Sequence, residues 1–545
     1  MDVSTALSAT QQMSPKQYFK QVSDLAHECI RESGDDPPHL GVLQSLVLIT
    51  AHEMFHAARG KAWRSLGACI RLAFELGLHK IDAAAMHRLG VGSTTAMMAE
   101  SWIMEEERRR TWWAIWEFDV FISTVNKLPV SITDGHNATL LPVDDESWFE
   151  GEQRESSFLD ADPVKRWKCL QTSGNLSGKA WFIVINSLTR DVHAISHPTL
   201  PVSQSKSDLN SKMSVTATKV NTLSNCVSCF VLALPAELSY ERFSAAENVD
   251  WITRRKVSEK QLIHVMVQLT KLYINHHHCF NRGSQLVGSL FSRILESPMG
   301  PGSHGGTKCS ESDNQSKLAW SEYLEAAGEI VQVVRGSHVD HVRYGHPLLA
   351  NTYWIAATIQ LLNKVLSTTE EERQLAQSNF ELLNLTLIRH QKFWSASSTP
   401  LTNLNLLNLR LDPLAVRQHY AGSSTEQTLP NSKVGSERPP DQDFDGMDFD
   451  RNQSTQERHQ EGAVESGLLD GHTVGLGQHC PDLENNVVNE ITGVGGRIDA
   501  WSGDIMDDNG LQAYIDTIFS NQWDNWDQTW IGESGFNPLP HHDVA

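Results

Sequence analysis

Apolar residues recur every three or four positions in two neighbouring stretches, residues 63–80 and 105–123, and this period predicts two amphipathic helices. The apolar positions of the first stretch share one side of the helix, and its charged residues lie off that side. This stripe consists of Trp63, Leu66, Ile70, Ala73 and Phe74. Gly77 is expected to end the helix in a left-handed turn, with Leu78 folding back onto the last turn.

The second stretch predicts a helix with a charged beginning and a bulky apolar continuation. Glu105, Glu106 and Glu107 are expected near its N-terminus, where negative charge is favourable. Arg109 and Arg110 follow four residues after the first two glutamates, a spacing that favours ion pairs along a helix. The expected buried bulk comes from Trp112, Trp113, Ile115, Trp116 and Ile122.

Similar apolar stripes elsewhere predict an all-α protein with a large helical domain. Residues 259–275 and 317–334 have the helical period without a grouping of catalytic side chains, which favours core packing. Residues 347–362 contain several polar side chains and fall short of the ~20 apolar residues that cross a bilayer. We therefore expect a buried helix there.

Composition and charge narrow the class of protein. The net charge of -21 works against direct binding of nucleic acid, which needs clustered lysine and arginine. Arg108–Arg110 stand beside three glutamates and are expected to form a solvated, paired face. Arg254–Lys256 are the other dense basic run, with a part in nuclear import as the alternative to a solvated face.

The eight cysteines are scattered, which is typical of a reducing compartment rather than of a disulfide framework. No secretory signal is apparent at the N-terminus. Cys226 and Cys229 form a single C-x-x-C beside an apolar run and are expected to be buried thiols. His276–His278 precede Cys279 and are expected at the end of a helix.

One motif raises the alternative of a zinc peptidase. His52, Glu53 and His56 form H-E-x-x-H, in which two histidines bind zinc and the glutamate activates water. Glu75 follows at a spacing found for the third ligand in one aminopeptidase family. Its neighbours differ from that family, and Trp63 occupies the place of a third histidine ligand in another. We therefore expect no metal, no cofactor and no enzymatic activity, with the peptidase as the alternative.

Taken together, the two amphipathic stretches resemble the fungal-specific transcription factor domain, which is the regulatory region of zinc binuclear cluster factors. The first follows the family pattern of a tryptophan, a glycine, "AIRLA" and "LGLHR", and the second follows "RRR.WW", an apolar run with aspartate, and a later proline. The resemblance covers roughly residues 38–410. The residues that match are Trp63, Gly67, Ile70, Arg71, Leu76, Gly77, Leu78, Arg110, Trp112, Trp113, Asp119 and Pro129. Asn126–Leu128 depart from the glycine and arginine that the family places before this proline.

The resemblance implies a nuclear transcription regulator, and family members often control secondary-metabolite genes. It also implies that DNA is contacted through a module of six cysteines, yet only Cys29 lies in the first 68 residues. We therefore expect DNA to be reached indirectly or through a missing module. A homo- or heterodimer is a further expectation, and a helical scaffold without a role in transcription is the second alternative.

The composition changes beyond residue 410. The expected division is an N-terminal segment 1–37, a helical regulatory domain 38–415, a disordered linker 416–490 and an acidic, aromatic tail 491–545. Alternation of acid with aromatic residues is typical of activation segments that bind a coactivator. The aromatic residues that carry this hypothesis are Trp501, Phe519, Trp523, Trp526 and Trp530. The alternative is that a helix over residues 511–519 packs on the main body.

Overall fold

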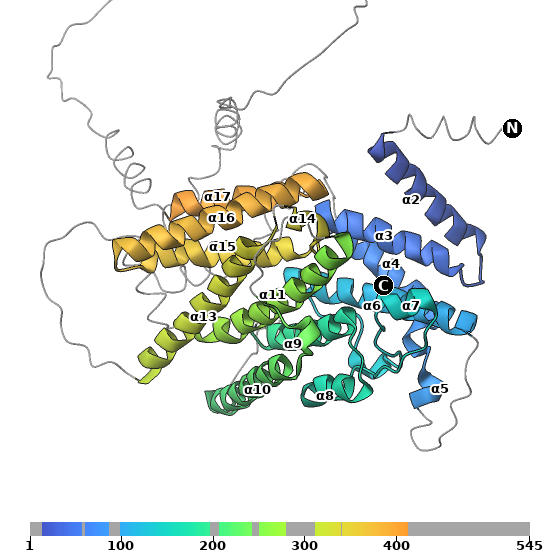
Figure 1. Ribbon diagram of the computed structural model, residues 1–545, viewed down its shortest axis with the longest axis horizontal. Coiled ribbons are helices and arrows are strands. Elements are labelled where there is room, and N and C mark those ends of the chain that lie inside the picture. Colours follow the sequence, from blue (N-terminus) through green and yellow to red (C-terminus); the bar gives the residue numbers. More distant parts are fainter. Residues whose placement is uncertain are drawn as a thin grey trace, which may run out of the picture. The chain divides into compact units, whose positions relative to one another are not determined.

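Helices form every long element of the computed structural model, which describes residues 14–56, 60–86, 99–196, 206–241, 250–279, 311–338 and 340–411 (Figure 1). Within these ranges no residue lies in a β-strand, and Leu140 and Phe158 form an isolated bridge. The all-α prediction is therefore confirmed for the described residues. The helices are α2 Pro15–Glu32, α3 Leu40–His56, α4 Lys61–Glu75, α5 Ala83–Met86, α6 Ala99–Asn126, α7 Asp145–Glu150, α8 Pro163–Ser173, α9 Gly178–Ser196, α10 Lys206–Ala233, α11 Trp251–Cys279, α13 Glu311–Gly336, α14 His341–Tyr344, α15 Leu349–Leu366, α16 Glu370–Trp394 and α17 Thr399–Arg410.

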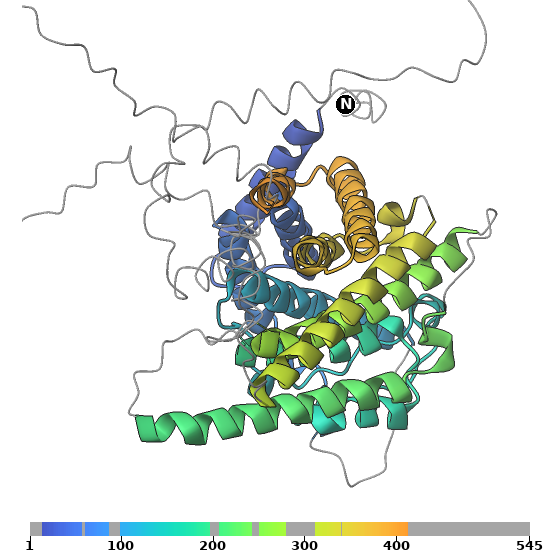
Figure 2. The same ribbon diagram turned by 90° about the vertical axis from the view of Figure 1, so that its left-hand side faces the viewer.

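The helices pack around one continuous apolar core. Helix α11 lies against α9 on one side and α13 on the other, and both views show α11 and α13 side by side (Figures 1 and 2). Helix α15 packs against α16, and α13 joins this pair to α11. Helix α6 contacts α4, α3 and α9, so it connects the N-terminal helices to the rest of the core.

The predicted end of the first amphipathic helix is confirmed. Helix α4 stops at Glu75, and Gly77 adopts a left-handed conformation with φ of 69°. Its N–H donates to the Phe74 carbonyl at 3.0 Å, and Leu78 is fully buried behind it. A side chain at Gly77 would strain this turn, because residues with a Cβ rarely adopt positive φ.

The second amphipathic helix is longer than its predicted range. Helix α6 already begins at Ala99, and the buried Trp102 continues its apolar side toward the N-terminus. The expectation that Glu105–Glu107 mark the helix start is therefore wrong, since they lie in its second and third turns. The expected bulk is confirmed, because Trp112, Trp113 and Trp116 are at most 2% exposed.

Helix α15 is buried along most of its length, as the sequence predicts for residues 347–362. Among the described residues, no helix combines the length and the apolar character needed to cross a membrane. Helix α16 follows directly and begins with a capping box, in which Thr369 and Glu372 each accept from the backbone N–H of the other.

Two further helices lie outside the stretches for which the apolar period predicts helix. Helix α7 lies inside the acidic stretch 144–162, where the Asp144 carboxylate accepts from the Ser147 N–H and caps it. Helix α2 lies within the N-terminal segment 1–37 and packs on α3. The linker 416–490 and the tail 491–545 lie outside the described residues.

Candidate functional site

Helix α6 carries a chain of charged side chains through the interior of the domain. Arg109 is 5% exposed and binds Asp82 in a bidentate manner, with its Nε 2.9 Å and its Nη2 2.6 Å from the two carboxylate oxygens. Asp82 also accepts from the Leu140 N–H. Arg109 further contacts Glu105 at 3.0 Å and Glu106 at 3.5 Å. This network ties the turn after α4 and the loop after α6 to the middle of α6.

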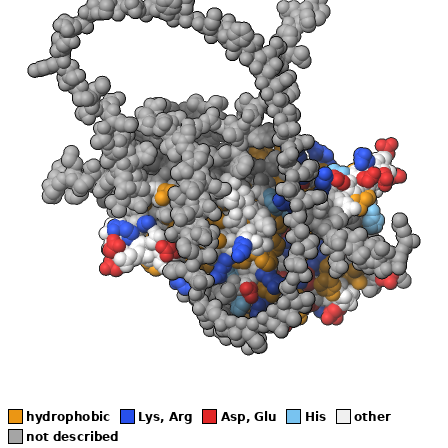
Figure 3. Space-filling view, turned by 90° about the horizontal axis from the view of Figure 1, so that it is seen from above, with side chains coloured by type: hydrophobic (Ala, Val, Ile, Leu, Met, Phe, Trp, Pro, Cys, Tyr) orange, Lys and Arg blue, Asp and Glu red, His pale blue; other side chains and the backbone are white. Residues whose placement is uncertain are grey.

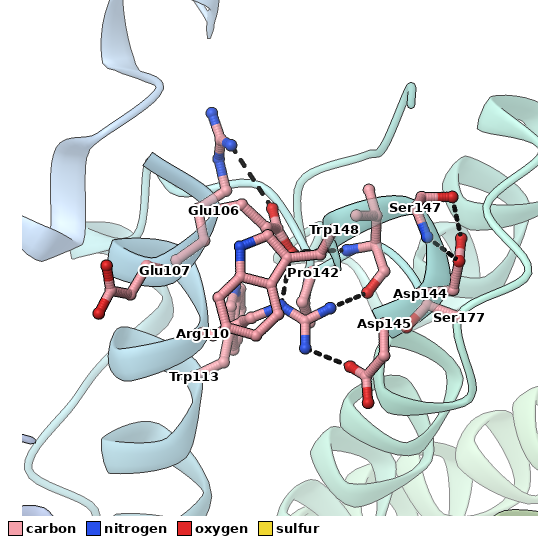
Figure 4. A network of polar contacts seen from close by, with 12 residues as sticks. Glu106, Glu107, Arg110, Trp113, Pro142, Asp144, Asp145, Ser147, Trp148 and Ser177 are labelled. Atoms are coloured by element: carbon pink, nitrogen blue, oxygen red, sulfur yellow. Dashed lines mark hydrogen bonds and ion pairs between the residues drawn. The ribbon is translucent and has the colours of Figure 1, made fainter. Parts of the chain in front are cut away.

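Arg110 extends the network toward α7 (Figure 4). Its guanidinium group contacts the Glu106 carboxylate at 3.2 Å, donates to the Val143 carbonyl at 2.7 Å and forms an ion pair with Asp145. It also stacks over the ring of Trp148 at 4.4 Å from the centroid, which favours a cation–π interaction. One side chain of α6 thus positions the following loop and helix α7.

Burial shapes the ionisation of these groups. Glu106 is 1% exposed, and this loss of water raises the pKa of its carboxyl, against the opposing influence of Arg110 and Arg109. Burial likewise lowers the pKa of Arg110. Each of these groups faces an opposite charge, which offsets part of the cost of burial.

Further along α6, Glu117 joins three other parts of the fold. Its carboxylate forms an ion pair with Lys179 of α9, and its Oε1 lies 2.8 Å from Nε2 of His346, just before α15. Burial opposes ionisation of Glu117, but Lys179 and His346 together lower its pKa to about 2. The carboxylate therefore stays charged at any physiological pH.

Asp119 holds the loop that follows α6. Its Oδ2 accepts from the N–H groups of Ser131 and Ile132, both at 2.8 Å. The Ser123 hydroxyl donates to the Pro129 carbonyl, one turn away. Asp119 and Pro129, which both match the family pattern, are thus joined through this loop. Lys127 has a positive φ of 53°, and it lies in the segment that departs from the family pattern.

A second cluster of buried charges lies between α8, α9 and the loop after α6. Asp134 accepts two hydrogen bonds from Arg190, each 2.8 Å long, and lies 3.5 Å from Arg166. Both arginines also contact Asp191. No motif marks these residues in the sequence; a basic residue within an otherwise apolar helix was the available signal, and sequence analysis missed it.

The two segments that resemble the family, residues 63–80 and 105–123, meet in the core. Phe74 of α4 and Trp112 of α6 pack edge to face, with 5.7 Å between their centroids. Arg108 donates to the Leu76 carbonyl at 2.6 Å, just before Gly77. Trp113 donates from its indole to the Leu140 carbonyl at 2.7 Å. These contacts explain why the two patterns occur together.

Several residues differ from the sequence-based expectation. Trp63 is 50% exposed, because the buried side of α4 runs through Ala62, one position earlier. Gly67 and Arg71 lie on the outer side of α4, where the Arg71 guanidinium donates to the Gly67 carbonyl. Ile70 is buried as expected. The expectation of a solvated face for Arg108–Arg110 is wrong as well: Arg109 is buried, Arg108 and Arg110 are half-buried, and Arg109 and Arg110 are paired with glutamates.

The H-E-x-x-H motif lies at the C-terminal end of α3. Glu53 is buried and forms an ion pair with Lys61 at 2.9 Å. The ring centroid of His52 lies 4.1 Å from that of Phe19 in α2 and 4.4 Å from that of His56. The glutamate that would activate water is thus tied to a lysine, and one histidine packs on an aromatic ring.

The other potential metal ligands are not brought together. Glu75 ends α4, and within the described ranges no group of three His, Cys, Asp or Glu side chains is arranged to hold a metal ion. Cys226 is buried as expected, whereas Cys229 is exposed. His276 lies near the end of α11 and contacts the Tyr323 hydroxyl at 3.4 Å.

The basic run at the start of α11 is paired with α7. Arg255 forms an ion pair with Asp145, and the Lys256 ammonium lies 2.7 Å from Glu146. Arg254 lies over the ring of Tyr344. Arg255 and Lys256 thus neutralise carboxylates of α7 and do not form an uncompensated basic surface of the kind that DNA requires.

Comparison with known proteins agrees with this architecture. Residues 3–255 match the model of the fungal specific transcription factor domain. The ascochitine biosynthesis cluster transcriptional regulator of Didymella fabae is 29% identical over 131 residues, 24% of this chain and 22% of that protein. The pigment biosynthesis transcriptional activator pigB of Monascus ruber is 29% identical over 121 residues, 22% of this chain and 21% of that protein.

A third relative, the tropolone cluster transcription factor tropK of Talaromyces stipitatus, is 26% identical over 157 residues, 29% of this chain and 26% of that protein. The chain thus spans only about a fifth to a quarter of the length of these relatives. The matched family and the relatives are transcription factors and not enzymes, in agreement with the prediction for this chain. No solved structure matches.

Proposed function

Because residues 3–255 carry a fungal-specific transcription factor domain, we propose that this chain regulates transcription through a helical domain and an acidic, aromatic tail. The observation that carries the proposal is the matched domain, with its two signature segments joined in one buried core. The tail, residues 491–545, would recruit a coactivator or the transcription machinery, since it alternates aspartate with large aromatic side chains.

The proposed route to DNA is indirect or through a zinc module that this sequence does not contain. A net charge of -21 disfavours contact with phosphates, and Arg109, Arg110, Arg255 and Lys256 of α6 and α11 are already paired with carboxylates. A DNA-bound partner, including a related factor in a heterodimer, fits these charges. The nucleus is the compartment that this function requires.

The class of target genes follows from the relatives. Those named above regulate the ascochitine and tropolone clusters and pigment biosynthesis. We therefore propose that this chain controls genes of a secondary-metabolite cluster.

Fusion of the full chain to a foreign DNA-binding domain, upstream of a reporter gene, tests the proposal. Changing the five tail aromatics to alanine should abolish most reporter activity. These are Trp501, Phe519, Trp523, Trp526 and Trp530. A matched control changes the nearby polar residues Gln512, Asn521, Asn525 and Gln528 to alanine and should leave the activity unchanged.

An inactive wild-type fusion at normal protein levels would favour the helical scaffold without a role in transcription. Reporter activity that is equal in both variants would place activation outside the tail.

A further inference from the structure

Helix α16 has an outward side that changes character along its length. Its first turns expose Glu370 and Glu371. Arg373 and Leu375 are exposed there as well. The last turns, residues 385–394, expose large apolar and basic side chains and contain no acidic residue. We call this set the α16 face: Leu385, Ile388, Arg389, Lys392 and Phe393. Figure 3 shows Lys and Arg side chains, in blue, beside hydrophobic side chains, in orange, at other places on the described surface.

The α16 face is one continuous strip, because its residues follow the spacing of a helical side. Leu385 is 58% exposed, Ile388 44% and Phe393 50%. The opposite side of the same turns is buried through Leu383, Leu387 and His390. The described helices therefore leave three large apolar side chains of this strip in contact with water, an arrangement that is typical of a binding surface.

The two cations of the face are also available. Neither Arg389 nor Lys392 forms an ion pair with a residue that the structure describes, whereas Arg109 and Arg110 have several such partners. An occupant of the α16 face should therefore be apolar and acidic.

One segment of this chain has that chemistry. Residues 507–527 contain Asp507, Asp508, Asp516, Asp524 and Asp527, and no lysine or arginine follows Arg497. Its apolar residues recur at helical spacing and are Leu511, Tyr514, Ile515, Ile518 and Phe519.

The two strips also match in length and in polarity. Residues 511–519 and residues 385–393 each span eight steps, or about 12 Å of helix. Asp507 and Asp508 lie at the N-terminal end of the tail segment, and the cations lie at the C-terminal end of α16. Opposite charges therefore meet when the two helices run antiparallel, which keeps Asp507 and Asp508 away from Glu370 and Glu371.

The segment can reach the face from within its own chain. Helix α17 packs on α15 and α16 and ends at Arg410, and about 100 residues separate it from the tail segment. A chain of that length spans up to roughly 300 Å when extended, far more than the reach required. Connection in one chain also raises the effective concentration of the segment at the face.

We propose that residues 507–527 dock as an amphipathic helix, antiparallel to α16, on the α16 face of the same chain. Docking covers the apolar side chains that a coactivator would bind, so the α16 face and the coactivator compete for one segment. The docking is independent of the proposed function, and only this competition rests on it.

A zero-length carbodiimide crosslink tests the contact in the full chain. This reagent couples a lysine ammonium to a carboxylate with which it is in contact. We expect Lys392 to be joined to Asp507 or Asp508, as identified by mass spectrometry, and the product to be lost in Lys392→Arg, which keeps the charge. Absence of this crosslink in the wild-type chain would overturn the proposal.

Limited chymotrypsin digestion of the full chain provides a second measurement. Docking should protect the bonds after Tyr514 and Phe519, because a bound helix is cleaved only when it opens. Reversal of both cations, in Arg389→Glu with Lys392→Glu, should increase the cleavage rate by about tenfold. Changing Asp507 and Asp508 to lysine in the same chain should restore protection.

The matched control is Arg373→Glu, an exposed cation of the same helix outside the α16 face. It should leave the cleavage rate unchanged. An equal increase in the control, or a double reversal without effect, would contradict the docking.

Mixing of isotope-labelled and unlabelled chains separates contacts within a chain from those between chains. Crosslinks within one isotope class support the proposal. Mixed products that increase with concentration would assign the face to a second copy. Where the reporter stays silent and the crosslink persists, the proposed function fails and the docking stands.

Discussion

Helices α6 and α16 are both long and both carry arginine and glutamate, but they use these charges in opposite ways. In α6 Arg109 is buried and Arg110 is half-buried, and the guanidinium group of each contacts at least two carboxylates. In α16 the ion pair between Arg373 and Glu370 lies at the surface, and the cations near the C-terminus face outward.

The difference shows what burial does to a charge. An exposed ion pair contributes about 0–1 kcal/mol to stability, since water solvates its members equally well when they are apart. Removing one partner of a buried pair costs about 3–5 kcal/mol, because the other charge stays in the interior. The ion pairs of α6 therefore determine how the neighbouring loops and helices pack on it. The exposed cations near the end of α16 can instead bind another surface.

The largest expected effect is the loss of a buried guanidinium group. Arg109→Ala leaves the buried carboxylates of Asp82 and Glu106 without their shared partner, and we expect a decrease of about 3–5 kcal/mol in the free energy of unfolding. Arg373→Ala in α16 is the matched control, with an expected change below about 1 kcal/mol. Urea unfolding measures both, and equal losses would remove the distinction between the helices.

Glu117 gives the next effect, which depends on pH. Its pKa is about 2 in the folded chain and 4.5 ordinarily, so its contribution is present above pH 4.5 and is lost as the pH falls toward 2. That contribution is roughly 3 kcal/mol at neutral pH. Glu117→Gln should therefore reduce stability at pH 7 and leave a shallower acid decline. Parallel curves of unfolding free energy against pH for the two chains would assign the ion pairs of Glu117 no role.

His390 on the buried side of α16 defines a different window. Burial, followed by the charges of His341 and His346, lowers its pKa from 6.5 to about 4. Its contribution is therefore complete above pH 6.5 and decreases as the pH falls from 6.5 to 4, by about 2 kcal/mol at pH 5. The stability of His390→Asn should fall less over this range, and thermal unfolding in a pH series measures the difference. A variant that declines as steeply as the wild type would locate the acid sensitivity elsewhere.

The smallest effect concerns the signature tryptophan that lies at the surface. Trp63→Ala removes a half-exposed side chain, and we expect a loss of about 1 kcal/mol or less. Trp113→Ala, which removes a fully buried indole, should cost about 3–5 kcal/mol. Thermal unfolding distinguishes the two. A loss for Trp63 as large as for Trp113 would mean that the exposed indole is essential for folding.

Local patterns could be predicted from the sequence because their physics is local. The left-handed turn at Gly77 and the pairs of Glu105 with Arg109 and of Glu106 with Arg110 depend on neighbours within four residues. The buried tryptophans follow from the helical period, which orients them on one side of α6.

The buried network could not be predicted, since its partners come from distant parts of the chain. Period alone does not tell a paired, solvated arginine from one that enters the core to meet Asp82 or Asp145. The prediction that Trp63 is buried was wrong for a related reason. Its position borders the buried side of α4, and the placement of α6 decides whether Trp63 or its neighbour is covered.

The partners of Glu117 have a consequence for the order in which the protein matures during synthesis. Lys179 emerges from the ribosome soon after α6, but His346 follows about 230 residues after Glu117. At about 5–20 residues per second, the Glu117 carboxylate remains without this second partner for roughly 10–45 s. Residues 3–255, which match the family model, do not include His346 either. A nascent chain therefore completes the contacts of Glu117 only after the start of α15 has been synthesised, and chaperones have that interval in which to bind it.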